Sequence, residues 1–336
     1  MLLFFSWPGR RIALPTVYER ALDRVRIMDS GGYDAVWLAE HHFNTYSVCP
    51  SVHMMATQVA AITTNLRIGT AVSLAAMYHP LRLAEEVALL DVLSGGRVNW
   101  GAGRGNDPTE FSVFSLDRDS SYDVFREHVD VVLRAWTEER LTYHGEFVHY
   151  EDVEVLPKPL QRPHPPVWMA ASSPEAISWS ASEGHAILMD PHSSHREIAL
   201  KFEAYRDERA AAGFGDDGLP TPMARLLAVA PTDGEAAEVA RQGAEWTVTA
   251  YANPSRRSQV YDHRSRQSQA AGPEEQSRDP VQRYVDEVIV HGSPARVIDE
   301  LQRLSHDMHL DYLLFAPLSH QSFILFTEQV LPAIAD

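Results

Sequence analysis

Short apolar runs alternate along this chain with segments whose apolar residues recur at helical spacing. The short runs are typical of buried strands, whereas apolar residues spaced three or four apart are typical of helices that pack on one face. We predict strands at residues 1–8, 33–39, 66–74, 97–103, 167–171, 186–189, 225–230 and 310–315. This alternation predicts parallel strands joined by helices.

Several predicted helices have recognisable ends. Thr16 and Glu19 fit a capping box, which predicts that the first helix begins at Thr16, and Gly31 is expected to end it. Pro80 is expected to open a later helix that ends at Gly95.

The number of predicted strands favours a (β/α)8 barrel, the TIM-barrel architecture. The alternative, an open doubly wound sheet, usually has fewer strands and a GxGxxG turn after the first one, and that turn is absent here. The chain has 336 residues, and α/β barrels are longer than most domains. We therefore expect one barrel domain over residues 1–336.

Two polar segments interrupt the alternation. Residues 138–165 predict a hairpin-like insertion that ends in a proline-rich stretch. Residues 253–280, expected after the seventh strand, contain almost nothing apolar. Such a segment is either a mobile lid or simple disorder, and both interpretations stay open.

Composition narrows the possible partners. The chain carries 29 basic and 46 acidic residues, a net charge of −17, which disfavours nucleic acid and anionic membrane surfaces as partners. No apolar run reaches the roughly 18 residues of a membrane span. The apolar start lacks the features of a signal peptide, and the only cysteine is Cys49, so we expect a cytoplasmic protein without an internal disulfide.

The first candidate site is Glu40-His41-His42-Phe43, directly after the second predicted strand. In a barrel the carboxyl ends of the strands form the active-site face, where an imidazole can act as a general base. The alternative is that one histidine caps the strand and the other is solvated. A metal site is disfavoured because adjacent histidines rarely bind one ion.

Two further turns offer backbone and side-chain groups for an anion. Gly101 to Asn106 follows the fourth strand, where glycines allow close backbone approach and Arg104 suits a phosphate. After the fifth strand, Ser173 fits a helix N-cap and Pro174 the first helical position, so backbone N–H groups would point at the barrel mouth. The alternatives are an ordinary tight turn and an ordinary cap.

Together these motifs resemble the bacterial luciferase-like flavin-dependent monooxygenase family. The matching runs are 37–43 (WLAEHHF), 68–71 (IGTA), 79–80 (HP), 93–97 (LSGGR), 103–105 (GRG), 171–174 (ASSP) and 292–294 (GSP). They follow the family's order over most of the chain. The resemblance implies a (β/α)8 barrel, usually dimeric, with FMN lying over the strand ends.

The resemblance also implies roles for individual residues. His41 matches the catalytic histidine, and Glu40 beside it supports the site. Ala71–Val72 falls where the family has a non-proline cis peptide under the flavin ring. Gly103 stands where luciferase itself carries a reactive cysteine, which puts light emission in doubt.

A phosphate-binding set follows from the same resemblance. Arg104, Ser172 and Ser173 match phosphate-binding positions, although luciferase has a glutamate at the position of Ser172. Tyr122 stands where luciferase has a second phosphate arginine, and its hydroxyl group can still bond a phosphate oxygen.

The implied activity is oxygenation of a small organic molecule by O2 and reduced FMN. A separate flavin reductase is expected to supply the reduced FMN, because no nicotinamide-binding motif is present. The substrate itself is not indicated. Three alternatives stay open: a deazaflavin-dependent oxidoreductase on the same fold, a non-catalytic flavin-binding relative, and a metal-dependent barrel hydrolase.

Overall fold

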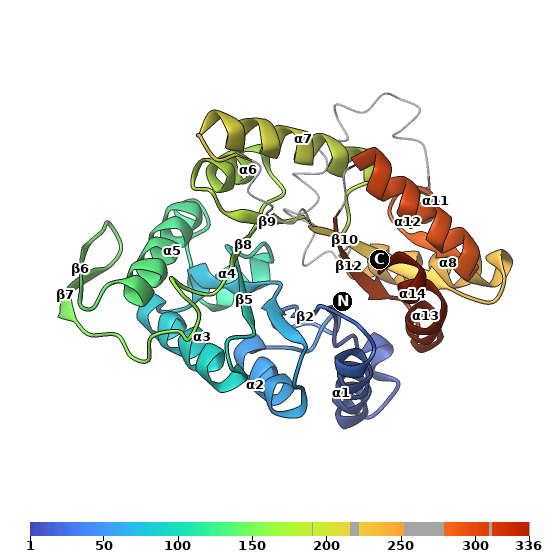
Figure 1. Cartoon of the computed structure of the whole chain (residues 1–336), viewed down its shortest axis with the longest axis horizontal. Helices are drawn as coiled ribbons and strands as arrows, with labels where there is room; N and C mark the ends of the chain where they lie inside the picture. Colours follow the sequence, from blue (N-terminus) through green and yellow to red (C-terminus); the bar gives the residue numbers. More distant parts are fainter. Residues whose placement is uncertain (190, 216–221, 252–278, 309–310, 336) are drawn as a thin grey trace. The chain divides into compact units, whose positions relative to one another are not determined.

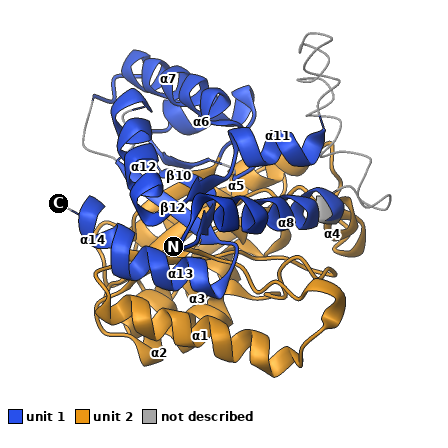
Figure 2. Cartoon of the chain, turned by 90° about the vertical axis from the view of Figure 1, so that its right-hand side faces the viewer, with its two compact units in different colours: residues 1, 171–336 blue, residues 2–170 orange. Residues whose placement is uncertain are grey.

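The computed structural model describes residues 1–189, 191–215, 222–251, 279–308 and 311–335 (Figure 1). Their contacts divide them into two compact units, which Figure 2 colours separately. The amino-terminal unit holds residues 2–170, and the carboxyl-terminal unit holds Met1 and residues from 171 onward. A single domain over residues 1–336 stays a prediction. Of the segment 253–280, only Asp279 and Pro280 are described, so the lid prediction lies outside the described residues.

Parallel strands form the centre of the amino-terminal unit. In sheet order they are β1 (Leu2–Leu3), β2 (Ala35–Leu38), β3 (Arg67–Thr70), β5 (Val98–Gly103) and β8 (Val167–Ala170), and the short β4 (Ser73–Leu74) pairs with β5. The predicted third strand is thus split into β3 and β4. Leu38 pairs with Thr70, so β2 and β3 end at the same edge of the sheet.

Helices connect these strands. They are α1 (Leu14–Ser30), α2 (Val52–Ile62), α3 (Pro80–Ser94), α4 (Pro108–Val113) and α5 (Ser121–Thr137), with short 3₁₀ turns at Pro8–Arg10 and Ala75–Met77. The predicted capping box at Thr16 is wrong. The helix already begins at Leu14, because Pro15 suits a first turn, where no N–H donor is needed. Gly31 and the left-handed Gly95 end α1 and α3 as predicted.

Large aromatic side chains fill the core of this unit. Trp37 of β2 meets Trp168 edge to face at a centroid distance of 5.3 Å, and Trp100 meets Trp136 at 5.0 Å. Gly69 faces Trp37 across the β2–β3 pair, where a Cβ atom would lie 2.2 Å from the indole ring. A glycine is therefore required there by packing.

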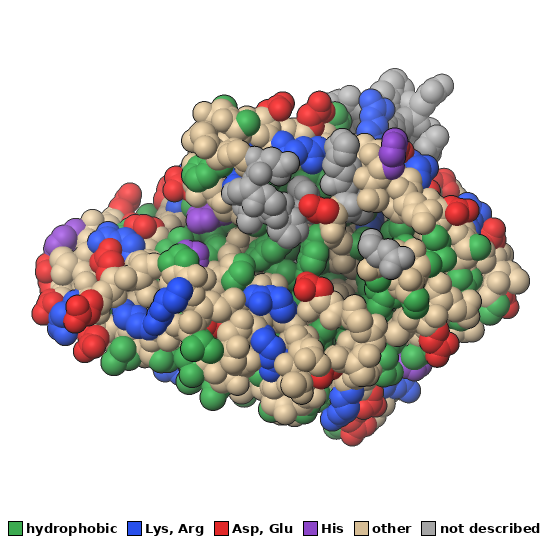
Figure 3. All heavy atoms as spheres, viewed as in Figure 1, with side chains coloured by type: hydrophobic (Ala, Val, Ile, Leu, Met, Phe, Trp, Pro, Cys, Tyr) green, Lys and Arg blue, Asp and Glu red, His purple; other side chains and the backbone are tan. Residues whose placement is uncertain are grey.

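The predicted insertion at 138–165 is found as an antiparallel hairpin of β6 (Leu141–His144) and β7 (His149–Val153). Acidic and basic side chains lie side by side on it, as the space-filling view shows (Figure 3). These surface pairs contribute little stability, since exposed ion pairs are each worth roughly 0–1 kcal/mol.

The carboxyl-terminal unit has a second parallel sheet. β10 (Pro222–Val229) lies between β11 (Val290–Gly292) and β12 (Tyr312–Pro317), and a parallel bridge joins Met189, after β9 (Ala186–Leu188), to Met223. β11 was not predicted from the sequence, because its three residues directly precede a helix. The helices of the carboxyl-terminal unit are α6 (Pro174–Ser182), α7 (His195–Ala211), α8 (Asp233–Tyr251), α11 (Pro280–Glu287), α12 (Pro294–Met308), α13 (His320–Leu325), a π turn (Phe326–Val330) and α14 (Leu331–Ile334). Within the described residues, no helix is long and apolar enough to cross a membrane.

Candidate active site

The sheet register gathers most of the predicted site residues of the amino-terminal unit along one edge. Glu40 and His41 follow β2, Ala71 and Val72 follow β3, and Arg104 follows β5. The Ala71–Val72 peptide bond is cis, as predicted. The carboxyl ends of three neighbouring parallel strands thus present this set on the face where barrel enzymes bind ligands.

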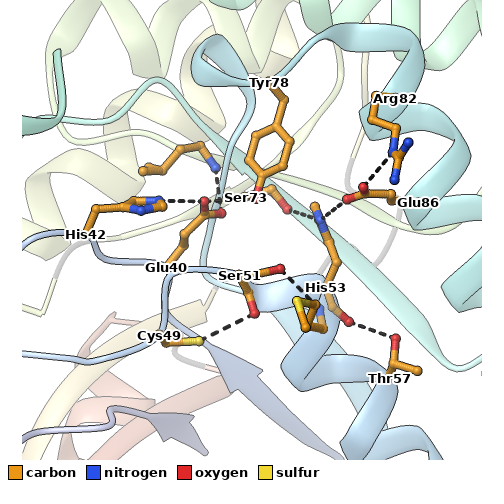
Figure 4. Close-up of polar contacts among 12 residues, drawn as sticks. Glu40, His42, Cys49, Ser51, His53, Thr57, Ser73, Tyr78, Arg82 and Glu86 are labelled. Carbon is orange, nitrogen blue, oxygen red and sulfur yellow. Dashed lines mark hydrogen bonds and ion pairs between the residues drawn. The ribbon is translucent and has the colours of Figure 1, made fainter. Parts of the chain in front are cut away.

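Glu40 is a buried carboxylate with three hydrogen-bond donors (Figure 4). Its Oε1 accepts from Tyr78 Oη at 2.9 Å and lies 3.0 Å from His42 Nε2, and its Oε2 accepts from the Leu74 backbone N–H at 3.2 Å. The histidine that Glu40 contacts is therefore His42. Burial and the Glu40 charge raise the pKa of Tyr78, which keeps its hydroxyl a donor.

Glu110 is a second buried carboxyl group at the same place, and it was not predicted as a site residue from the sequence. It lies in the first turn of α4, and its Oε1 accepts the backbone N–H of His42 at 3.0 Å. Burial, more than any neighbouring charge, raises the pKa of Glu110 to about 7. Burial lowers the pKa of His42, but the hydrogen bond and charge of Glu40, with the charge of Glu110, raise it overall.

Two exposed aromatic side chains flank this cluster. Phe43, with a left-handed φ of 56°, and Phe114 lie 5.5 Å apart between ring centroids, and Phe114 meets the His42 ring edge-on at 4.8 Å. Their exposed fractions of 58% and 41% are high for phenylalanine. An apolar surface therefore borders the acid–histidine cluster.

His41 is half-buried beside the rings of Phe4 and Tyr46. Its ring centroid lies 6.3 Å from that of Phe4 and 5.4 Å from that of Tyr46, which it meets nearly at right angles. Its backbone N–H donates to the Cys49 carbonyl at 3.0 Å. Aromatic packing and this backbone bond thus hold the His41 imidazole at the strand end.

Arg104 is half-buried and stacked on aromatic rings. Its guanidinium carbon lies 4.0 Å from the Tyr122 ring centroid and 5.5 Å from that of Phe111, and one nitrogen donates to Ser121 Oγ at 3.0 Å. No carboxylate of the described residues pairs with it. A desolvated guanidinium with unused donors suits an anionic ligand.

Contacts within each unit explain two of the predicted site residues, Gly103 and Ser173, without a ligand. At Gly103 a Cβ atom would lie 2.4 Å from Val72 Cγ2, so packing against Val72 by itself requires glycine there. In the carboxyl-terminal unit, Ser173 caps α6 as predicted, accepting from the Ala176 N–H at 3.2 Å, with Pro174 in the first turn. Ser172 is exposed. A joint phosphate pocket of Arg104 with Ser172 and Ser173 stays a prediction.

A further polar cluster lies between α2 and α3 (Figure 4). His53 Nδ1 lies 3.1 Å from Glu86 Oε2 and its Nε2 lies 3.0 Å from Ser73 Oγ, while Arg82 donates to Glu86 at 2.8 Å. Ser73 is fully buried, and its hydroxyl group is bonded to His53. The described residues contain no cluster of three or more metal-ligating side chains with suitable geometry.

Comparisons with known proteins identify the family. Residues 1–311 match the family model described as luciferase-like monooxygenase. A protein of Sinorhizobium fredii, called uncharacterized protein y4wF, is 36% identical over 197 residues, covering 58% of this chain and 57% of that protein. The oxygenase component of flavin-dependent trigonelline monooxygenase from Acinetobacter baylyi is 30% identical over 185 residues, covering 54% and 51%. The matches to these curated relatives thus span little more than half of their length.

Solved structures share the fold over nearly the whole chain. Monooxygenase RslO1 from Streptomyces bottropensis is 26% identical with a TM-score of 0.82, covering 99% of this chain and 98% of its own. The oxygenating constituent of 3,6-diketocamphane monooxygenase from Pseudomonas putida, in complex with FMN, has a TM-score of 0.80 at 19% identity, covering 98% and 96%. An F420-dependent secondary alcohol dehydrogenase has a TM-score of 0.75 at 19% identity, covering 95% and 96%.

The fold is therefore the luciferase-like (β/α)8 barrel, as predicted. The chain belongs to the luciferase-like monooxygenase family.

Proposed function

We propose that this protein is a flavin-dependent monooxygenase that uses reduced FMN and O2 to oxygenate a small organic substrate. One observation carries the proposal: Arg104, half-buried and without a carboxylate partner in the described part of the chain, lies on the same strand edge as the buried Glu40 and the half-buried histidines. A site for an anionic cofactor and a group able to transfer protons thus occur together. The family membership supports the same activity.

The described residues fit FMN by the chemistry of their donors. Arg104 would hold the phosphate, with Tyr122 stacked behind its guanidinium and Ser172 and Ser173 as the predicted further donors. Bound reduced flavin would supply the two electrons that activate O2.

His41 is the proposed acid–base residue, at the end of β2. Glu40 is proposed to organise the site, because its three donors fix the loop after β2 against β4 and Tyr78. The exposed rings of Phe43 and Phe114 would help to exclude water from an apolar substrate.

Two partners belong to the proposal. A separate flavin reductase would supply reduced FMN, which the name of the trigonelline enzyme's oxygenase component supports. A homodimer is also proposed, supported by three exposed aliphatic side chains of α3, Leu89, Val92 and Leu93.

Anaerobic titration tests the cofactor. We expect reduced FMN to bind more tightly than reduced FAD, and Arg104→Ala to weaken reduced FMN by ~1.5–3 kcal/mol, the scale of a hydrogen bond to a charged group. Arg82→Ala, an exposed arginine of α3, is the matched control and should leave binding unchanged. If the Arg104 and Arg82 variants bound reduced FMN equally well, Arg104 would not be the residue that holds the phosphate.

The second candidate is a deazaflavin-dependent oxidoreductase, because an F420-dependent dehydrogenase shares this fold. The same titration with a reduced deazaflavin separates the two. Tight, selective deazaflavin binding without O2 consumption would replace the monooxygenase proposal. Formation of an oxygenated product from a substrate with reduced FMN and O2, absent without the protein, would exclude both the second candidate and a non-catalytic flavin-binding protein.

A further inference from the structure

Two buried carboxyl groups contact one histidine at the strand-end edge. Glu40 is 4% exposed and Glu110 is 2% exposed. Glu40 Oε1 lies 3.0 Å from the ring nitrogen Nε2 of His42, and Glu110 Oε1 accepts the backbone N–H of the same residue at 3.0 Å. One imidazole is thus the nearest source of positive charge for two carboxyl groups.

Among the described residues, the surroundings of Glu110 supply no other cation. The titratable groups around it and around Glu40 are Asp107, at the N-cap of α4, His42 and Cys49, after β2, and Tyr78, before α3. Arg104 is turned to the rings of Tyr122 and Phe111, and no lysine or arginine of the described residues pairs with Glu110. A buried carboxylate without a cation is costly, so the neutral carboxyl form is favoured.

Hydrogen bonding identifies the atom that holds the proton. Because Glu110 Oε1 accepts the His42 N–H, a proton on Glu110 belongs on Oε2. Glu40 differs, because its two oxygens together accept from three donors. Of the two carboxyl groups, Glu110 is therefore the one with an oxygen, Oε2, that accepts no hydrogen bond from the described residues and is left to hold a proton.

We propose that Glu110 is a proton-storage residue of this site, which carries a proton on Oε2 and exchanges it under the influence of the His42 charge. Burial raises the pKa of Glu110 to about 7, in agreement with this assignment. Its use in catalysis rests on the proposed monooxygenase function. In that reaction one oxygen atom of O2 enters the substrate, and the other takes two electrons from the reduced cofactor and two protons to leave as water. Glu110 is a source for one of those protons.

The proton site can be tested without any cofactor. Carbon-13 NMR of the glutamate carboxyl carbons follows each group through a pH titration of the intact protein. We expect one glutamate resonance with a midpoint near neutral pH, far above the ~4.3 of an ordinary glutamate. The resonance should vanish in Glu110→Gln, which keeps the acceptor oxygen for the His42 N–H.

Glu86→Gln is the matched control. Glu86 also contacts a histidine, His53, but Arg82 pairs with it, and the hydrogen bond from His53 is the first of the interactions that lower its pKa to about 2. The neutral-pH resonance should therefore persist in this variant. A wild-type spectrum with no glutamate titrating above pH ~6, or a neutral resonance that survives Glu110→Gln, would overturn the proposal.

A second variant keeps the test decisive if Glu110→Gln does not fold. His42→Gln removes the nearest positive charge, so the midpoint of the neutral resonance should rise, by ~1 pH unit for a close charge. An unchanged midpoint would contradict the proposed coupling. Failure of reduced-FMN binding would instead affect only the proposed function, since these spectra require no flavin.

Discussion

The two ends of the sheet in the amino-terminal unit carry polar networks that differ in how well their hydrogen-bond donors match their acceptors. At the start of the strands, Arg97 donates to the carbonyls of Ala60, Thr63, Leu66 and Ser94 and to the Thr63 hydroxyl, all between 2.7 and 3.2 Å. At the carboxyl ends of the strands, Glu40 and Glu110 both contact His42, Glu40 at the imidazole and Glu110 at the backbone N–H. The first network is rich in matched donors, whereas the second has an excess of carboxyl groups.

A neighbouring group of polar side chains at the strand starts also has its hydrogen-bond donors and acceptors paired. Arg67 donates to the Asn99 side chain and the Val98 carbonyl, and the fully buried Asp91 accepts both the backbone N–H and the side-chain amide of Gln161. Satisfied buried groups fix one conformation, while groups with spare protonation capacity can do chemistry. We therefore expect substitutions at the strand starts to cost stability and those at the strand ends to cost activity.

The largest effect is expected at His41. His41→Ala should fold and bind FMN, yet product formation should fall by roughly 10²- to 10⁴-fold, the range for a positioned acid–base group. His42→Ala should matter less. Turnover of purified variants with reduced FMN, O2 and a substrate measures this, and near-normal turnover of His41→Ala would remove the residue from its proposed role.

Arg97→Met tests the other end of the comparison. It removes donors from several part-buried carbonyls at once, so the free energy of unfolding should fall by about 3–5 kcal/mol, as for other broken buried networks. Urea denaturation measures the loss, and FMN affinity of the folded protein should not change. Arg82→Met, where an exposed i,i+4 ion pair is lost, is the control and should leave the free energy of unfolding nearly unchanged. Similar losses in the two variants would contradict the interpretation.

Glu110 should make stability depend on pH. Its pKa is raised from 4.5 to about 7 in the folded protein, so unfolding releases its proton whenever the pH lies between these values. The stability that Glu110 contributes is fully present below pH 4.5 and is lost as the pH rises through about 7. The total is about 3–4 kcal/mol, since the shift from 4.5 to about 7 is about 2.5 pKa units and each unit corresponds to about 1.4 kcal/mol.

Urea denaturation across this pH range, compared between wild type and Glu110→Gln, isolates the effect. The variant should gain stability relative to wild type as the pH rises from 5 to 8. Parallel pH profiles for the two proteins would show that Glu110 keeps an ordinary pKa.

Local signals explain what the sequence could predict. The Ser173 cap and the Gly95 helix end depend on residues close in sequence, and both are found. The early start of α1 was missed because Pro15 outweighs the Thr16 pattern. The short β11 has too few residues to show a periodicity, and pairing with β10 defines it.

The residues of the candidate active site also separate into those that local sequence signals predict and those that only the fold brings together. The Glu40-His41-His42 run was selected because it follows a predicted strand. Glu110 was missed because it is 68 residues from its hydrogen-bond partner His42, a distance that only the folded sheet closes. Its one available signal was its place in the first turn of the helix that follows the glycine-rich turn.

The smallest predicted effect concerns Tyr122, and it decides how Arg104 is held. The sequence suggested a phosphate contact through the Tyr122 hydroxyl, whereas the structure stacks the ring on the Arg104 guanidinium at 4.0 Å. Tyr122→Phe keeps the ring, so it should weaken reduced-FMN binding by ~0.5 kcal/mol or less, about twofold. Tyr122→Leu removes the cation–π contact and should cost about 1–2 kcal/mol, because the guanidinium is partly desolvated. Anaerobic titration of both variants measures the difference. If Tyr122→Phe were as damaging as Tyr122→Leu, the hydroxyl itself would be the binding group, and the stack would only position it.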